Sequence, residues 1–416
     1  MSELSYLEKL MDGVEVEWKA VGDIAGYSTT KVDADKLDAT SFVGVDNLLA
    51  DKGGRIDATY QPNTARLTAY EPGDILLGNI RPYLKKVWMA ENNGGCSGDV
   101  LAIRILADCK KIISPEYLYY ALSSDSFFSY SMQHAKGAKM PRGSKDAILN
   151  YQIPIPCPSA PEKSLAIQSE IVRILDKFTA LTAELTAELN MRKKQYNYYR
   201  DQLLSFKDGE VEWKTLGEIG DFTYGYAAKA MDSGDARFVR ITDINKDGKL
   251  SKENPMYVEL NEENEKYTLD KNDLLMARTG ATFGKTMIFE EDYPAVYAGF
   301  LIKLNLNKTI INAKYYWHFA QSDFFWEQAN KLVSGGGQPQ FNANALKQVR
   351  VPIPYPSHPQ KSLDEQGRIV DILDKFDAIT ASITEGLPRE IELRQKQYEY
   401  YRDLLLSFPK PETVSN

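Results

Sequence analysis

Apolar residues recur at intervals of three and four along two long segments of the chain. In the first segment they are Ile171, Ile174, Phe178, Leu181 and Leu185, and in the second they are Ile369, Ile372, Phe376, Ile379 and Ile383. This spacing places them on one face of a helix, as in a heptad repeat. The pattern predicts two long helices that pair as a coiled coil; the alternative is two surface helices, each packed on its own domain.

The two helical segments differ at one place. Glu385-Gly-Leu-Pro-Arg389 adds four residues and a helix breaker to the second segment. Because proline removes a backbone donor and clashes with the preceding turn, we expect the second helix to be interrupted or kinked near Gly386 and Pro388. The first helix, from Glu162 to Leu204, spans about 65 Å at 1.5 Å per residue. That length suits a spacer.

Short apolar runs typical of strands precede each helical segment. They form three pairs across the two halves of the chain: Phe42–Val45 with Phe238–Ile241, Asp74–Leu77 with Asp273–Met276, and Val100–Ile103 with Phe300–Lys303. A helix is expected to start at Ser114-Pro-Glu-Tyr117, since serine is a good N-cap and proline a good first helical residue. Each half is therefore expected to mix strands and helices before its long helix.

Several stretches of sequence occur twice. Arg192–Phe206 returns as Arg394–Phe408 with twelve of fifteen positions identical. Glu15-Val-Glu-Trp-Lys19 returns as Glu210-Val-Glu-Trp-Lys214, and Ile153-Pro-Ile-Pro156 as Val351-Pro-Ile-Pro354. The repeats predict a pseudo-twofold α+β protein, in which two similar α/β domains are joined by two long helices. A repeat of domain followed by helix brings those helices together antiparallel.

These marks divide the chain into successive segments. The expected boundaries are a leader helix (1–14), a first globular domain (15–156), a first helical spacer (157–207), a second globular domain (208–354), a second helical spacer (355–408) and a tail (409–416). The leader Tyr6–Gly13 faintly echoes Leu203–Gly209. If it supplies the helix end that the first half lacks, the architecture is circular; the alternative is a frayed terminus.

Length and composition limit the class of protein. A chain of 416 residues needs two to four domains, and its 43% hydrophobic and 26% charged content is that of a soluble globular protein. No apolar run is long enough to span a membrane, and the N-terminus lacks the features of a signal peptide. Three cysteines without metal-type spacing indicate reduced thiols, so we expect a cytoplasmic protein without a membrane partner.

Charge is segregated along the chain. The net charge of −8 argues against a general nucleic-acid binder, but a local basic surface remains compatible with it. Residues 328–363 contain no acid, and residues 126–161 contain Asp146 alone.

Two loops in these acid-poor segments align at an offset of 198 residues, with Gly137 matching Gly335 and Pro141 matching Pro339. The first loop carries cations suited to phosphates and to guanine: Lys136, Lys139, Arg142 and Lys145. The second carries small residues and amides, the amides suited to bidentate contact with adenine: Ser334, Gly335, Gly336, Gln338, Gln340 and Asn342. Either a DNA contact or a solvated flexible loop accounts for this composition.

Further cations follow the central strands. They are Arg81, Lys85 and Lys86 in the first half, and Arg278 and Lys285 in the second. We read them as phosphate or base contacts, with exposed surface charge as the alternative. The tyrosines of the repeated helix ends, such as Tyr198 and Tyr400, stand at helical spacing and are read as packing or partner contacts.

Strings that imitate catalytic motifs are incomplete. Gly280-Ala-Thr-Phe-Gly284-Lys-Thr286 is one residue short of a P-loop and is read as a glycine-bearing turn. Asn254-Pro-Met-Tyr257 resembles the tetrapeptide of amino-methyltransferases, but no cofactor loop of Phe-x-Gly-x-Gly type exists in the chain. The three histidines are too scattered for a metal or catalytic site. We identify no catalytic residue, metal site or cofactor site.

The layout resembles the specificity subunit of type I restriction-modification systems over nearly the whole chain. The marks are Gly73-Asp-Ile75, Asn272-Asp-Leu274, the two Pro-x-Pro segments, and Glu365-Gln366 followed by Ile369–Leu373. The first half departs from the Glu-Gln pair, with Ile167-Gln168.

The resemblance implies a non-catalytic subunit that reads double-stranded DNA. Residues 15–156 and 208–354 would be target recognition domains for the two parts of a bipartite site, and the two conserved helices would set the gap. It also implies two modification subunits that bind S-adenosylmethionine, and restriction subunits that use ATP and Mg²⁺; no cofactor is expected on this chain. The alternatives are an enzyme in its own right and a coiled-coil adaptor without DNA binding.

Overall fold

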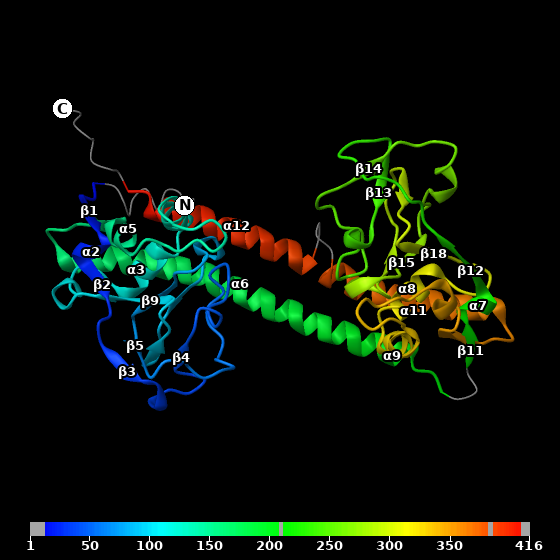
Figure 1. Ribbon diagram of the computed structural model, residues 1–416, viewed down its shortest axis with the longest axis horizontal. Coiled ribbons are helices and arrows are strands. Elements are labelled where there is room, and N and C mark those ends of the chain that lie inside the picture. The colour runs from blue at the N-terminus through cyan, green and yellow to red at the C-terminus, as the bar shows by residue number, and fades with distance from the viewer. Residues whose placement is uncertain (1–12, 208–210, 382–385, 409–416) are drawn as a thin grey trace. The chain divides into compact units, whose positions relative to one another are not determined.

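A computed structural model describes residues 13–207, 211–381 and 386–408 (Figure 1). Residues 1–12 of the predicted leader helix and the tail lie outside the described residues, as does Ile383. The chain divides into two compact units: Met1–Ala183 with Glu392–Asn416, and Glu184–Ile391. The described residues 392–408 therefore belong to the same unit as residues 13–183. The domain boundaries drawn from sequence remain a prediction.

Unit 1 has two four-stranded sheets and a two-stranded ladder. The first sheet has the order β2-β9-β6-β7 and the second the order β3-β5-β8-β4. The strands are β1 (Val16–Ala20), β2 (Ala25–Tyr27), β3 (Lys31–Asp33), β4 (Phe42–Val43), β5 (Arg66–Tyr70), β6 (Ile75–Gly78), β7 (Val87–Met89), β8 (Gly94–Cys96), β9 (Val100–Ile105) and β10 (Gln152–Pro156). Its short helices are α2 (Val21–Ile24), α3 (Pro115–Leu122), α4 (Asp125–Gln133) and α5 (Lys145–Asn150).

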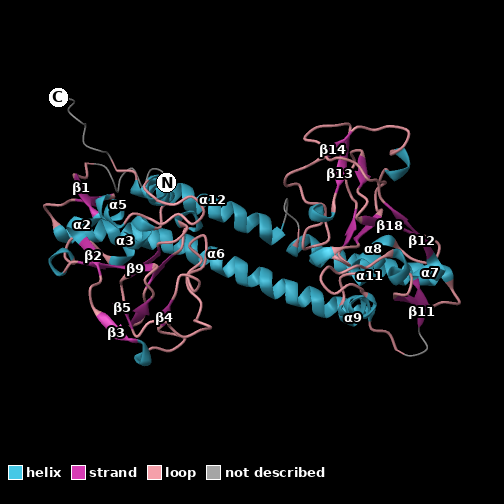
Figure 2. Cartoon of the chain, in the orientation of Figure 1, coloured by secondary structure: helices cyan, strands magenta, loops and turns pink. Residues whose placement is uncertain are grey.

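Unit 2 repeats this plan with a smaller second sheet. Its sheets have the orders β12-β18-β15-β16 and β14-β13-β17. The strands are β11 (Val211–Thr215), β12 (Gly220–Tyr224), β13 (Ala236–Val239), β14 (Tyr257–Val258), β15 (Leu274–Ala277), β16 (Thr286–Ile288), β17 (Ala295–Tyr297), β18 (Leu301–Leu306) and β19 (Arg350–Pro354). Its short helices are α7 (Leu216–Ile219), α8 (Ala313–Phe319), α9 (Asp323–Leu332) and α10 (Ala343–Leu346). In each unit the second sheet stands on the side away from the helices (Figure 2).

The expected strands are present within one to three residues of their predicted ends. The expected helix start is also confirmed: the Ser114 hydroxyl accepts a hydrogen bond from the Tyr117 amide, and Pro115 is the first residue of α3. The α+β class with two repeated domains is thus confirmed by the two matching sheet orders.

The repeated sequence marks at the two ends of each domain pair with each other. β1 is antiparallel to β10, with Trp18 opposite Pro154, and β11 is antiparallel to β19, with Trp213 opposite Pro352. Prolines at every second position of β10 and β19 leave the missing N–H groups on one edge, which keeps the other edge free to pair. The Pro-x-Pro segment is therefore a strand that closes the domain.

Three helices make up the long helical segments. They are α6 (Pro161–Leu204), α11 (Pro359–Thr380) and α12 (Gly386–Leu406). The predicted interruption of the second segment is confirmed, since α11 ends before Gly386, which has a left-handed φ of 75°. A Cβ at Gly386 would lie 2.6 Å from the Ala378 carbonyl oxygen.

The long helices pack antiparallel within each unit. In unit 1 the Phe178 ring of α6 stacks on Tyr401 of α12, and Leu405 joins the core that holds Ile171 and Leu175. Residue numbers therefore increase in opposite directions along α12 and α6. In unit 2 Tyr199 of α6 stacks on Phe376 of α11 in the same sense, with Leu204 in one core with Ile369.

The heptad positions take part in two kinds of packing. Ile171 and Ile369 are fully buried in the cores of their own domains, where the early turns of α6 and α11 pack. The same cores also contain Leu405 of α12 and Leu204 of α6. Further along, aromatic residues such as Phe178 and Phe376 contact the antiparallel helix. The predicted antiparallel pairing is thus confirmed, and each long helix also packs on its own domain.

A buried glutamine fastens each long helix to its domain. The Gln168 side chain accepts a hydrogen bond from the Ser114 amide and donates to the Ile112 carbonyl and the Ser164 hydroxyl. Gln366 makes the matching contacts with Asn312, Ile310 and Ser362. Both glutamines are fully buried, so each satisfies its polar atoms inside the protein. Of the Glu-Gln pair, only the glutamine occurs in both halves, and it is the residue that fastens the helix to the domain.

Candidate nucleic-acid interface

Each unit joins one turn and one hairpin loop into a surface that we call the loop platform. In unit 1 the platform consists of the turn of residues 79–85, which follows β6, and the hairpin loop of residues 136–142. In unit 2 it consists of residues 278–285, after β15, and 334–340. The hairpin loops close with reciprocal backbone hydrogen bonds, between Lys136 and Arg142 and between Ser334 and Gln340.

The backbone of the platform is the same in both units. The Arg81 amide donates to the Pro141 carbonyl at 2.7 Å, and the Gly280 amide to the Pro339 carbonyl at 3.0 Å. Gly137 and Gly335 have left-handed φ values of 104° and 91°. A Cβ at Gly335 would lie 2.6 Å from the Gln338 carbonyl oxygen, so the turn requires glycine there. The alignment of the two loops made from sequence is confirmed.

The cations of the unit 1 hairpin loop differ in their surroundings. Within the described residues, the exposed side chains of Lys136 and Lys139 have no ion-pair partner. Arg142 is held by an ion pair to Asp99 yet leaves 55% of its side chain exposed. Lys145 begins α5, where its ammonium lies 5.8 Å from the centre of the Tyr27 ring. These four cations remain candidates for DNA contact. The Arg142 side chain is oriented by its ion pair with Asp99.

The cations of the unit 1 turn do not all face solvent. Arg81 is exposed, in a left-handed conformation with φ of 51°. The Lys86 ammonium donates to the Val45 carbonyl at 2.8 Å, and Lys85 pairs with Asp125 at 2.7 Å. Both lysine side chains thus have partners within the protein, and the DNA contacts expected of Lys85 and Lys86 remain predictions.

Asp125 is the centre of an ion-pair cluster between the first domain and the end of α12. Lys52 and the fully buried Arg402 also contact it, at 3.2 Å and 2.8 Å. Burial works against ionisation, but hydrogen bonds from Lys85 and Arg402 hold the pKa of Asp125 well below its ordinary value. Lys85 is thus engaged in fastening domain to helix.

The unit 2 hairpin loop presents amides to solvent. Ser334, Gly335, Gly336 and Gln338 are exposed, and Gln340 is half-buried. The Asn342 side-chain oxygen accepts a hydrogen bond from the Ala345 amide and caps α10, as Ser144 caps α5 at the matching position. Bidentate adenine contact needs that same oxygen. The bidentate contact predicted for Asn342 therefore competes with its role as the N-cap of α10. The position of this asparagine directly before a helix is a sequence signal for that role.

Arg278 and Lys285 are the first and last residues of the unit 2 turn, and their side chains have different surroundings. The Arg278 guanidinium lies over two exposed rings, Tyr224 and Phe300, which sequence reasoning did not single out. Lys285 follows a short helical turn at Gly280–Thr282, which confirms the turn interpretation of the P-loop-like string. Lys285 lines a pocket of about 310 Å³ with Lys193 and other residues of α6.

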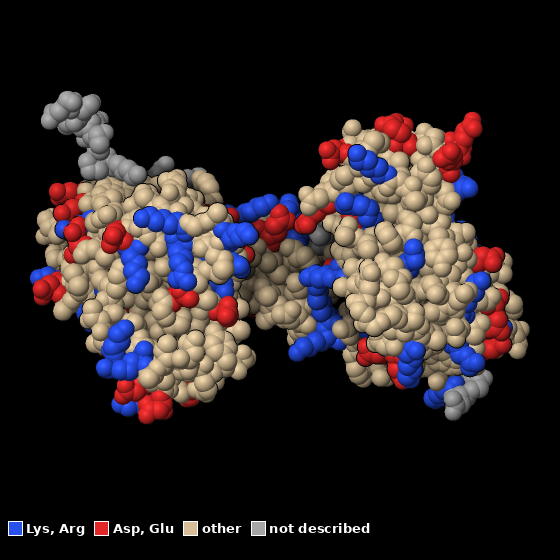
Figure 3. Space-filling view, in the orientation of Figure 1, with Lys and Arg blue, Asp and Glu red and all other residues tan. Residues whose placement is uncertain are grey.

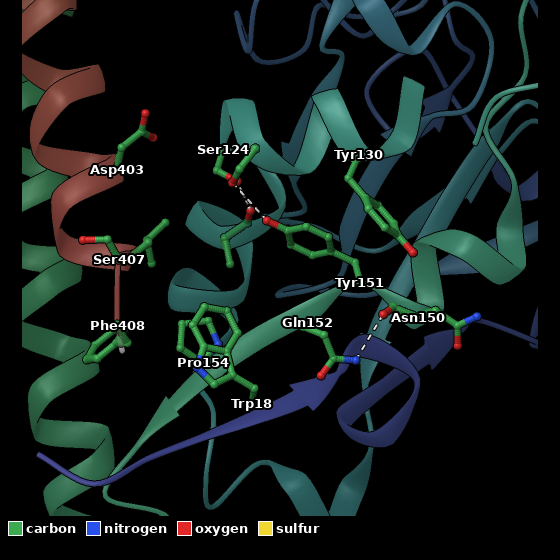
Figure 4. A pocket seen from close by; sticks show the side chains of 13 residues that line it. Trp18, Ser124, Tyr130, Asn150, Tyr151, Gln152, Pro154, Asp403, Ser407 and Phe408 are labelled. Carbon is green, nitrogen blue, oxygen red and sulfur yellow. Dashed lines mark hydrogen bonds between the residues drawn. The ribbon is translucent and has the colours of Figure 1, made fainter. Parts of the chain in front are cut away.

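A larger pocket of unit 1, of about 740 Å³, has no described lining residue in common with the platform (Figure 4). Trp18, Tyr151 and Pro154 line it from the domain side, and Ser407 and Phe408 from the end of the chain. Asp403 is its one charged lining residue among those described. A pocket without a cation offers no attraction for a phosphate backbone.

Charge is unevenly distributed over the described surface. On the visible face of unit 1, Lys and Arg side chains gather toward the middle, and most acidic side chains lie near the margins (Figure 3). The part of the chain that the structure describes has no group of three or more His, Cys, Asp or Glu side chains placed to hold a metal ion. None of its helices is both long and apolar enough to cross a membrane. All three cysteines are free.

Two repeated α+β domains, each with a loop platform, and antiparallel helices that connect them define a class of two-domain recognition scaffold. The family model described as type I restriction modification DNA specificity domain matches residues 72–192 and 209–393. The chain belongs to this family of type I restriction enzyme specificity subunits.

The relatives match over almost their full length. The chain is 42% identical to the type I restriction enzyme EcoR124I/EcoR124II specificity subunit of Escherichia coli, covering 100% of both chains. It is 33% identical to the EcoprrI specificity subunit of the same species, covering 92% of this chain and 93% of that one.

Solved structures share the fold. A type I restriction-modification S subunit from M. genitalium has a TM-score of 0.54 at 14% identity, covering 96% of this chain and 98% of its own. A chain from a study of complex assembly in a type I restriction-modification system has a TM-score of 0.55 at 18% identity, covering 94% and 97%.

Proposed function

We propose that this specificity subunit is non-catalytic and that each loop platform contacts one part of a bipartite site on double-stranded DNA. The observation that carries the proposal is the matched pair of platforms: one backbone frame, with Arg142 at the position that Gln340 occupies in the other unit. A shared frame with different side chains is suited to reading two different short sequences in the same manner.

The rest of the assembly follows from the resemblance. Two modification subunits, which bind S-adenosylmethionine and methylate adenine, would sit on the long helices, and restriction subunits that use ATP and Mg²⁺ would join them. Base flipping would belong to the modification subunits. One structural neighbour was solved in work on the assembly of a type I restriction-modification complex, which supports such partners. Three free cysteines suit a cytoplasmic location.

Reconstitution tests the proposal. The purified chain alone should neither methylate nor cut DNA, and addition of its modification subunit should restore methylation at a bipartite site. Methyl transfer by the chain alone from labelled S-adenosylmethionine would instead make it an enzyme. An adaptor without DNA function would show no salt-dependent DNA binding, whereas a platform with several phosphate contacts loses affinity steeply as salt rises.

A further inference from the structure

The arginines of the two platforms are distributed differently. Unit 1 has Arg81 on its turn and Arg142 on its hairpin loop. In unit 2 those two positions hold Gly280 and Gln340, and the one arginine among the platform residues is Arg278, on the turn. The backbone places match: the Asn79 amide donates to the Asp99 carbonyl, and the Arg278 amide to the Phe300 carbonyl. Arg278 thus stands where unit 1 has Asn79, and Phe300 stands where unit 1 has Asp99.

The Arg278 guanidinium is fixed in orientation. Its carbon lies 5.2 Å from the Tyr224 ring centre and 5.4 Å from that of Phe300, and its Nε donates to the Gly299 carbonyl at 3.2 Å. Among the described residues, its two terminal nitrogens have no hydrogen-bond or ion-pair partner. The two donors of the guanidinium fork are therefore oriented and unused.

The two rings that hold Arg278 are unusually open to solvent. Phe300 is 57% exposed and Tyr224 is 44% exposed. The Tyr224 hydroxyl accepts a hydrogen bond from the Ala343 amide, which anchors that ring beside the hairpin loop. Because these rings already hold the guanidinium in place, Arg278 loses little conformational entropy when a ligand binds to it.

From this arrangement we propose that Arg278 reads a guanine edge in the part of the site that unit 2 contacts, with Phe300 and Tyr224 as its positioning residues. The proposal rests on the DNA-reading function above. A planar fork matches O6 and N7 of guanine with two parallel hydrogen bonds. The same fork can also bind a phosphate, which carries no sequence information, so the variants below are chosen to separate the two contacts. In unit 1 the ion pair with Asp99 orients Arg142 in place of the rings.

Four variants separate base reading from a phosphate contact. With modification subunits present, R278A and R278K should both lower discrimination at one G·C pair of the unit 2 part of the site, by roughly 5- to 150-fold. F300A should give a smaller loss of the same kind. Y293F, which removes the hydroxyl of an exposed unit 2 tyrosine outside the platform, should leave the recognised sequence unchanged.

A double variant tests whether Phe300 acts through Arg278. If it does, R278A combined with F300A should lose no more discrimination than R278A alone. F300Y, which keeps an aromatic ring, should retain the discrimination that F300A loses. A purely structural role of Phe300 would make the two losses add. Thermal unfolding of each variant beside the unchanged chain shows whether a loss of discrimination reflects a loss of folding.

The outcomes distinguish this inference from the proposed function. If the unchanged chain directs methylation to a bipartite site and R278K leaves that site and its efficiency unaltered, the base-reading role is wrong and the proposed function stands. If R278A weakens binding to all sequences equally and lowers the salt slope by roughly 0.9, Arg278 is a phosphate contact. If the unchanged chain directs no methylation to any defined site, the proposed function itself fails.

Discussion

His318 occupies a buried position where the two units differ in chemistry. Its Nδ1 lies 2.9 Å from the Tyr196 hydroxyl and its Nε2 lies 2.9 Å from an Asp374 carboxylate oxygen. In unit 1 the matching residue is Tyr120, whose hydroxyl donates to Asp176 at 2.6 Å. Both arrangements tie a domain helix to a long helix, but only the imidazole titrates near neutral pH.

The lowered pKa of His318 contributes to the response of unit 2 to acid. Burial lowers this pKa, although the neighbouring Asp374 and Asp377 act in the opposite direction, and the charge of Lys249 lowers it further. The unfolded chain takes up a proton at an ordinary pKa of about 6.5. The unfolded state therefore binds more protons below that pH, and stability falls as pH falls. Burial raises the pKa of Asp377, which opposes part of that loss.

Replacing His318 tests this effect. H318Y, which installs the residue found at the matching position of unit 1, should remove most of the drop in stability between about pH 6.5 and pH 5. The measurement is the urea midpoint of the full chain at pH 7 and pH 5.5, with Y120F as the matched control in unit 1. An equal drop in the unchanged chain and in H318Y would exclude His318 as its source.

Contacts at residue scale were only partly predictable from sequence. The N-cap Ser114 follows a local rule, so it was found. The ion pair of Lys85 could not be predicted, because its partner Asp125 is 40 residues away, and the buried Arg402 that shares this partner is 277 residues from Asp125. No local pattern signals such contacts. The exposed rings of Tyr224 and Phe300 were missed because apolar strand residues are usually buried.

At the scale of elements, strand pairing explains why the Glu-Val-Glu-Trp-Lys and Pro-x-Pro segments are both repeated: in each unit the two segments pair with each other. Periodicity predicted the long helices and the break at Gly386, because helix geometry and breakers act locally. The ladder of β1 with β10 was not predictable, since strand pairing joins segments more than 130 residues apart. The hydrogen bonds between each turn and hairpin loop are of the same long-range kind.

Helix α6 begins in unit 1 and ends in unit 2, so its length bears on the gap between the two parts of the site. Inserting one heptad between Leu181 and Leu189 lengthens the helix by about 10 Å and keeps its faces in phase. Methylation mapping should then show a wider gap between unchanged half-sites. A seven-residue insertion at the exposed residues Glu262 and Glu263 is the control. Altered half-sites with an unchanged gap would remove α6 from this role.

At the scale of the whole molecule, the two units share one architecture and differ in their side-chain contacts. The same sheet order, buried glutamine and loop platform occur in both units. The two units differ where they would meet DNA and where the domains are fastened to the helices, by the Asp125 cluster in unit 1 and by His318 with Asp374 in unit 2. Contacts in one unit should therefore be changeable without effect on the other.

A genome-wide methylation map of paired variants tests this independence most directly. Replacing Arg142 with Ala should relax one half-site, and replacing Gln338 and Gln340 with Ala should relax only the other, by roughly 1–3 kcal/mol of discrimination per base-edge contact. Replacing Gln348, an exposed glutamine of unit 2 outside the platform, with Ala serves as the matched control. If each platform variant changes its own half-site alone, the account holds; if either variant changes both half-sites, or neither changes any, the account is contradicted.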